Sequence, residues 1–246
     1  MICRTYAPNS ATFYTRRAKV IKPTKGQVHF ILLKVHSLTG IVPIGLFLAF
    51  HLAVNSLRTV GPLQYQISID LINNMPFLIW IEIIFIYIPL LFHSAMGFYI
   101  TFNPGINVLR YNHPRNWMYT LQRVTGGVVF VFLVYHMATT VGPKMYYGKH
   151  LFEAAPFLID ALNEEFGSWL GRVIYLVGIV SATFHFANGL WGFCVSWGII
   201  IGPQAQRNAS VLFFLFGLGL TFIGFATVFE FSVNPLSVEP TISGKL

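Results

Sequence analysis

The sequence predicts an all-α integral membrane protein with five transmembrane helices, the first four arranged as an up-down bundle. The chain of 246 residues is 55% hydrophobic and only 10% charged, which is too apolar for an ordinary soluble domain. Five stretches also reach the roughly 20 mostly apolar residues that a spanning helix needs. These stretches are residues 34–57, 76–102, 117–142, 168–200 and 209–233.

The connections between these stretches are rich in turn-forming residues. "NPGIN" (103–107) and "NHPRN" (112–116) separate the second and third spans, and "GPQAQRN" (202–208) separates the fourth from the fifth. The connection after the third span is longer, and we expect a short surface helix in it near residues 156–165. The chain thus divides into a basic N-terminal segment (1–30), a transmembrane domain (31–233) and a C-terminal tail (234–246).

Basic residues indicate how the chain crosses the membrane. There are 16 Lys and Arg residues against 8 Asp and Glu residues, and in a membrane protein such a surplus sets orientation and does not point to nucleic acid. The N-terminal segment shares one side with the loop that holds Arg110 and Arg115 and with the loop that holds Arg207. We therefore expect a multi-pass protein of the cytoplasmic membrane, with its N-terminus in the cytoplasm and its C-terminus outside.

Four of the eight histidines lie within spans, one on each of the first four: His51, His93, His136 and His185. One intramembrane histidine would be interpreted as a satisfied core residue, but ionisable groups in a bilayer are costly and usually functional. Counting depth at about 1.5 Å per residue sorts the four into two levels. His51 and His136 lie toward the outer side, and His93 and His185 lie toward the inner side.

Each level joins alternate spans, which are diagonal partners in an up-down bundle. A diagonal pair of imidazoles with a flat gap between them is what a bis-histidine haem requires. We therefore interpret the pattern as two haems stacked across the membrane. His93 and His185 would ligate the inner iron, and His51 and His136 the outer iron.

Small and polar residues near these histidines suit the surroundings of a haem. Glycines would let a flat ring approach the backbone, although glycine is equally common where membrane helices meet. Polar groups at the inner mouth would bind the haem propionates. The residues expected in these roles are Gly40, Gly97, Gly126 and Gly189, together with His36, Ser37, Arg123 and Trp197.

Two other kinds of site use intramembrane histidines. A proton-coupled transporter normally adds Asp or Glu partners and discontinuous helices, whereas Glu82 is the only clear intramembrane acid here. A metal ion bound directly by histidines would find only two ligands at each level. The haem interpretation fits the spacing best, and a reduced-minus-oxidised spectrum of the membrane fraction would discriminate between it and a transporter.

Four motifs resemble the dihaem cytochrome b membrane subunit of succinate:menaquinone oxidoreductases and fumarate reductases of the bacillar type. They are "HSLTGIVPIGLFLAFH" (36–51), "IPLLFHSAMGFYI" (88–100), "RNWMYTLQRVTG" (115–126) and "FHFANGLWGF" (184–193). The resemblance covers about residues 30 to 232. It implies two b haems with the same four histidine ligands, a flavoprotein with FAD and an iron–sulfur subunit on the cytoplasmic face, and menaquinone as the electron acceptor. Succinate would be oxidised in the partner, and this chain would only transfer electrons.

The resemblance also bears on quinone and proton chemistry. We expect menaquinone near the outer haem, beside Asn55, Arg58 and Glu82, and a second pocket at the inner side is possible with Arg17, His36 and Trp197. In fumarate reductases of epsilon-proteobacteria, a glutamate two residues before the fourth ligand is assigned to proton transfer, and Thr183 stands at that place here. An anchor for another dehydrogenase, such as a hydrogenase, stays open as an alternative.

Overall fold

A computed structural model describes residues 24–102, 108–147 and 162–236, and every regular element in these ranges is helical. Five helical stretches are long and apolar enough to cross a membrane, which confirms the predicted fold class. They are Lys25–Thr59, Leu78–Phe102, Pro114–Thr140, Trp169–Ser196 and Pro203–Val233. Arg17 lies outside the described residues, as does most of the expected surface helix near 156–165, of which residues 162–165 are helical.

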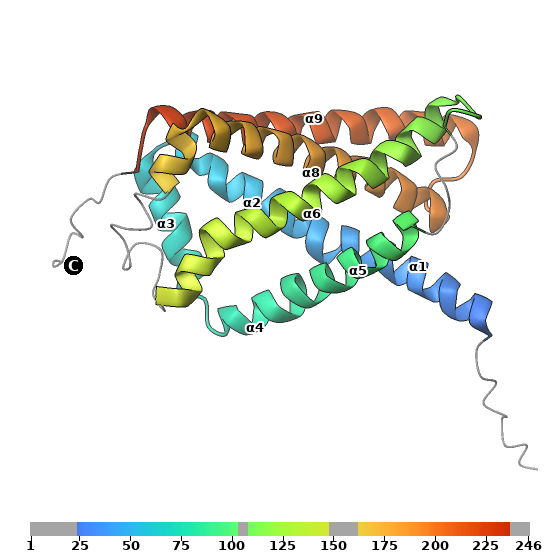
Figure 1. The fold of residues 1–246 in the computed structure, drawn as a ribbon, viewed down its shortest axis with the longest axis horizontal. Helices are drawn as coiled ribbons and strands as arrows, with labels where there is room; N and C mark the ends of the chain where they lie inside the picture. Colours follow the sequence, from blue (N-terminus) through green and yellow to red (C-terminus); the bar gives the residue numbers. More distant parts are fainter. Residues whose placement is uncertain (1–23, 103–107, 148–161, 237–246) are drawn as a thin grey trace, which may run out of the picture.

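The first span consists of α1 (Lys25–Ile41), α2 (Pro43–Ser56) and the 3₁₀ turn η1 (Leu57–Thr59). It begins well before the expected residue 34 because Thr24 and Gln27 form a capping box, in which each side chain accepts a hydrogen bond from the other residue's backbone N–H. Pro43 interrupts the helix because proline has no backbone N–H and crowds the preceding turn. The two halves still follow nearly one line (Figure 1).

The sequence analysis did not predict α3 (Pro62–Asn73), which follows the first span outside the five candidate spans. Pro62 occupies the first turn of this helix, where its missing N–H costs nothing. Tyr65 on α3 is buried, and its ring lies 5.7 Å from the ring of Phe231. Burial raises the pKa of the Tyr65 phenol to about 12. Through the contact of Tyr65 with Phe231, α3 closes one end of the molecule (Figure 1).

The second span contains α4 (Leu78–Glu82), the π-helical turn η2 (Ile83–Tyr87) and α5 (Ile88–Phe102). Within the π turn, the N–H of Ile88 bonds to the carbonyl of Ile83, five residues back. The turn ends two residues before Pro89, which cannot donate to the helix ladder and needs room for its ring. The irregular turn accommodates the proline within a continuous span.

The last three spans are α6 (Pro114–Tyr147), α8 (Trp169–Ser196) and α9 (Pro203–Val233). The start of α8 is capped by Ser168, whose hydroxyl accepts from the N–H of Gly171 at 2.9 Å. Helix α9 starts before the expected residue 209, because Pro203 suits the first helical turn and Gly202 adopts a left-handed φ of 86°.

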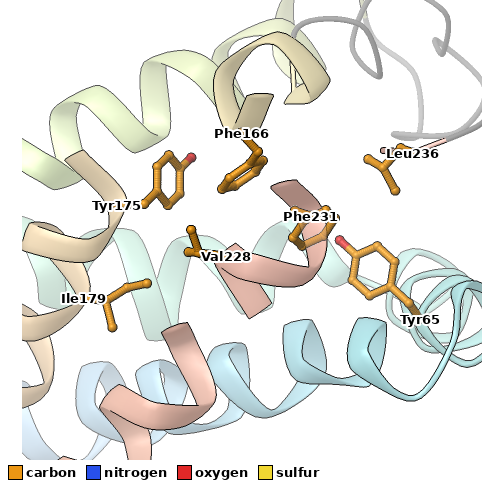
Figure 2. Close-up of a cluster of buried hydrophobic side chains, with 7 residues drawn as sticks. All are labelled: Tyr65, Phe166, Tyr175, Ile179, Val228, Phe231 and Leu236. Atoms are coloured by element: carbon orange, nitrogen blue, oxygen red, sulfur yellow. The ribbon is translucent and has the colours of Figure 1, made fainter. Parts of the chain in front are cut away.

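The first four spans contact one another in a ring: α1 packs on α5, α5 on α6, α6 on α8, and α8 on α1. Helix α9 lies outside this ring along α8 and α2 (Figure 1). Near the end that α3 closes, side chains from several elements form a buried cluster (Figure 2). We call it the aromatic-end cluster, and it consists of Tyr65, Phe166, Tyr175, Ile179, Val228, Phe231 and Leu236.

Candidate functional site: two facing histidine pairs

The structure brings together the histidines that the depth count pairs. The ring centroids of His51 and His136 lie 5.8 Å apart at 76°, and those of His93 and His185 lie 6.2 Å apart at 85°. Two imidazoles bound on opposite sides of one metal, with metal–nitrogen bonds of about 2.0–2.1 Å, have their centroids roughly 6.3 Å apart. Both pairs therefore fit axial ligation of a haem iron. In the described ranges no group of three or more His, Cys, Asp or Glu side chains could hold a metal ion.

Hydrogen bonds fix both rings of the His93–His185 pair. Nδ1 of His93 lies 3.0 Å from the carbonyl oxygen of His36, and Nδ1 of His185 lies 3.0 Å from the carbonyl oxygen of Gln122. A carbonyl can only accept, so each Nδ1 carries the proton and each Nε2 keeps a free lone pair. Metal-binding histidines commonly donate their second ring N–H in this way.

A glycine stands four residues after each of these two carbonyls. A Cβ added at Gly40 would overlap the His93 ring, and one at Gly126 would lie 3.0 Å from Cε1 of His185. These two glycines thus make room for the histidine rings themselves, whereas the sequence analysis expected them to make room for a porphyrin. The same arrangement occurs twice, between α1 and α5 and between α6 and α8.

Other predicted residues gather beside the His93–His185 pair. The His36 ring stacks on the His93 ring at 4.1 Å and 11°, and it faces Gly97, where a Cβ would lie 3.6 Å from its Cε1. Ser37 and Trp197 are also brought together, since the indole N–H of Trp197 donates to the Ser37 hydroxyl at 3.1 Å. The predicted polar residues of α1 and the end of α8 therefore meet at this end of the bundle.

Arg123 and Gln122 attach α6 to its neighbours at the same end. The Arg123 guanidinium donates to the carbonyl of Ile100 on α5 at 3.1 Å and to the Tyr119 hydroxyl. The amide of Gln122 donates to the His185 carbonyl at 3.0 Å and accepts from Asn188 at 2.7 Å. A Cβ at Gly189 would lie 3.3 Å from this amide, so Gly189 faces Gln122. The sequence analysis missed Gln122, although a polar residue within an apolar span was a usable signal.

The His51–His136 pair has different neighbours. Nδ1 of His136 lies 3.1 Å from the hydroxyl of Tyr175, another residue that the sequence analysis missed. Phe132 stacks on the His136 ring at 5.6 Å and 20°, and Phe47 lies beside the His51 ring at 5.4 Å. Side chains rather than backbone carbonyls therefore surround this pair.

The predicted quinone residues are only partly brought together. The Asn55 amide donates to the His51 carbonyl at 2.8 Å and lies 3.5 Å from Nε2 of His51. Arg58 is 5% exposed, and its guanidinium donates to the carbonyl of Asn234 at 2.8 Å. Glu82 is half-buried at the end of α4, and in the described part of the chain no hydrogen bond or ion pair joins it to Asn55 or Arg58.

The fold and the paired rings define a class: multi-pass helical membrane proteins with histidines that face one another within the span region. The chain belongs to the family described as Succinate dehydrogenase/Fumarate reductase transmembrane subunit, which it matches over residues 103–228. It is also 33% identical over 207 residues to a protein of Bacillus subtilis (strain 168) named Succinate dehydrogenase cytochrome b558 subunit. That alignment covers 84% of this chain and 98% of the relative. The family that the motifs indicate is thereby confirmed.

Proposed function

We propose that this chain is the dihaem cytochrome b membrane anchor of a succinate:menaquinone oxidoreductase. The observation that carries the proposal is the two facing histidine pairs, with ring separations of 5.8 and 6.2 Å, on alternate spans of one ring of helices. The name of the Bacillus subtilis relative supports the association with succinate dehydrogenase and with haem b. As an anchor, the chain would hold a flavoprotein and an iron–sulfur subunit at the membrane.

His93 and His185 would hold one haem through Nε2, and His51 and His136 would hold the other. When bound, two b haems supply one-electron carriers between the iron–sulfur clusters and menaquinone. The His93–His185 pair is the one nearer the partners if the N-terminus is cytoplasmic, because α1 enters from the N-terminal segment at that end. Succinate itself would react at FAD in the flavoprotein, away from this chain.

The proposed quinone neighbours are at the other end. Nε of Arg58 is buried and has no hydrogen-bond partner in the described part of the chain, so it is available to donate to a quinone carbonyl. Burying an unsatisfied donor is costly, which favours a ligand at that place. Asn55 and Glu82 complete the proposed set at this end, and Arg17, His36 and Trp197 are the set for a second pocket.

The experiment is a reduced-minus-oxidised spectrum of the purified complex, first with the native chain and then with His51→Ala. The native complex should contain two b haems, and His51→Ala should lose one haem and quinone reduction while succinate still reduces artificial dyes. His29→Ala is the matched control, because His29 is exposed at the start of α1. A haem-free native complex would refute the proposal, and loss of only the haem at His93 and His185 would refute the pairing.

Co-purification tests the partners separately. A flavoprotein and an iron–sulfur protein should remain with the chain through purification in mild detergent. Recovery with the subunits of another dehydrogenase, such as a hydrogenase, would show that the anchor serves a different enzyme. Recovery of the chain alone and without haem would favour a transporter.

A further inference from the structure

Tyr175 differs from the other groups that hold the four histidines. Its hydroxyl lies 3.1 Å from Nδ1 of His136, and its ring meets the His136 ring edge-on at 5.7 Å. Among the described residues, it is the only side chain within hydrogen-bond distance of an Nδ1 atom of these four histidines, since the Nδ1 atoms of His93 and His185 contact carbonyls. The Tyr175 contact is therefore the one that a point substitution can remove cleanly.

The surroundings hold the Tyr175 hydroxyl in place. Tyr175 is 6% exposed and belongs to the aromatic-end cluster, where its ring lies 4.7 Å from that of Phe166 (Figure 2). The hydroxyl of Thr139 and the carboxylate of Glu165 also act on this hydroxyl electrostatically. A hydroxyl in such a network is polarised, which makes its oxygen a better acceptor.

We propose that Tyr175 is a positioning residue that tunes the reduction potential of the haem held by His51 and His136. The inference rests on the proposed function. If Nε2 of His136 binds iron, Nδ1 must carry the proton and donate it to the Tyr175 oxygen. That hydrogen bond fixes the ring orientation and makes the imidazole a stronger electron donor. A stronger donor stabilises ferric iron, so the contact lowers the reduction potential of this haem.

The test is a redox titration of both haems in the complete complex that carries Tyr175→Phe. We expect both haems to remain, the midpoint potential at His51 and His136 to rise, and the other potential to stay unchanged. Tyr65→Phe is the matched control, because Tyr65 is also 6% exposed and lies in the same cluster, but no hydrogen bond or ring contact joins it to a histidine of the described ranges. This control should leave both midpoint potentials unchanged.

The outcomes separate this inference from the proposed function. Two haems in the native complex with an unchanged midpoint potential in Tyr175→Phe would overturn the inference alone, as would equal shifts from Tyr175→Phe and Tyr65→Phe. A native complex without haem would overturn the proposed function. If Tyr175→Phe does not assemble, Thr139→Val provides the test. That variant removes a polar neighbour of the hydroxyl, so it should shift the same midpoint potential by a smaller amount, and no change would count against the inference.

Discussion

The two histidine pairs are held in contrasting ways. At the His93–His185 pair, both Nδ1 atoms contact main-chain carbonyls of a neighbouring helix. At the other pair, His136 contacts the Tyr175 hydroxyl, and Phe132 and Phe47 lie beside the rings. One end thus depends on how closely two helices approach, and the other depends on which side chains are present. Contacts to main-chain carbonyls survive most side-chain substitutions, so the surroundings of the His93–His185 pair are hard to change. The surroundings of the His51–His136 pair can be changed by single side-chain substitutions.

The close approach at the first pair is possible because of glycine. A carbonyl on a helix already accepts from the N–H four residues later, and a side chain on that later residue would crowd an incoming ring. At Gly40 and Gly126 there is no side chain, so the His93 and His185 rings reach the carbonyls of residues 36 and 122. The contrast between the pairs can be tested by substitutions that add a side chain at these glycines or change the side chains beside the other pair.

The largest effect is expected from Gly40→Ala. The added Cβ would overlap the His93 ring, and the ring cannot yield without losing its carbonyl contact. Overpacking of this kind costs about 1–3 kcal/mol, and about 1.4 kcal/mol corresponds to a tenfold change in a binding constant. We therefore expect about a tenfold or greater loss of haem affinity at His93 and His185, measured as haem content and by reduced-minus-oxidised spectra.

Two controls accompany Gly40→Ala: the haem at the other histidine pair, and an alanine substitution at a glycine with free space around it. The spectrum of the haem at His51 and His136 should remain. Gly127→Ala should change neither haem, because a Cβ there has nothing within 4 Å. Equal loss of both haems in Gly40→Ala would mean that the bundle itself collapses and that the two ends are not independent.

Gly126→Ala should show a smaller effect at the same haem. Its Cβ would lie 3.0 Å from Cε1 of His185, which is tight but needs a shift of only a few tenths of an ångström. We expect the haem to be retained with a shifted absorption band or midpoint potential, and spectroelectrochemistry would measure both. A greater loss of haem in Gly126→Ala than in Gly40→Ala would contradict the expectation that the tighter position shows the larger effect.

Some of these features could be predicted from the sequence, and others could not. The five spans follow from apolar length, and the facing of His51 with His136 and of His93 with His185 follows from depth counting; their role as haem ligands stays a prediction. Helix α3 was missed because twelve residues of mixed polarity do not resemble a span. Gln122 was missed although its polarity within an apolar span was a usable signal. Tyr175 was missed because its contact with His136 depends on how each helix is rotated about its axis.

Gly178→Ala is the reciprocal test at the other pair. A Cβ at Gly178 would overlap the Phe132 ring, which stacks on His136. The effect reaches the histidine only through Phe132, so we expect a modest change, confined to the haem at His51 and His136. Separate titration of the two haems would show it. A changed midpoint potential of the haem at His93 and His185 instead would mean that Phe132 does not determine the surroundings of the His51–His136 pair.

The smallest effect is expected at Thr183, the position where the sequence analysis notes a glutamate in fumarate reductases of epsilon-proteobacteria. Thr183 is 1% exposed, and its hydroxyl lies 2.7 Å from that of Thr221 on α9. Each hydroxyl also has a carbonyl of its own helix within hydrogen-bond distance, so one threonine donates to its partner and the other donates to its own carbonyl. Interhelical hydrogen bonds in membranes contribute about 0.6 kcal/mol on average.

Thr183→Val and Thr221→Val should therefore each lower the unfolding temperature of the complex slightly. The double variant should lower it by less than the sum of the two single effects, because each substitution removes the same contact. None of the three variants should alter either haem spectrum or the rate of quinone reduction. A large loss of quinone reduction in Thr183→Val would instead show that the hydroxyl pair takes part in proton transfer despite the missing carboxylate.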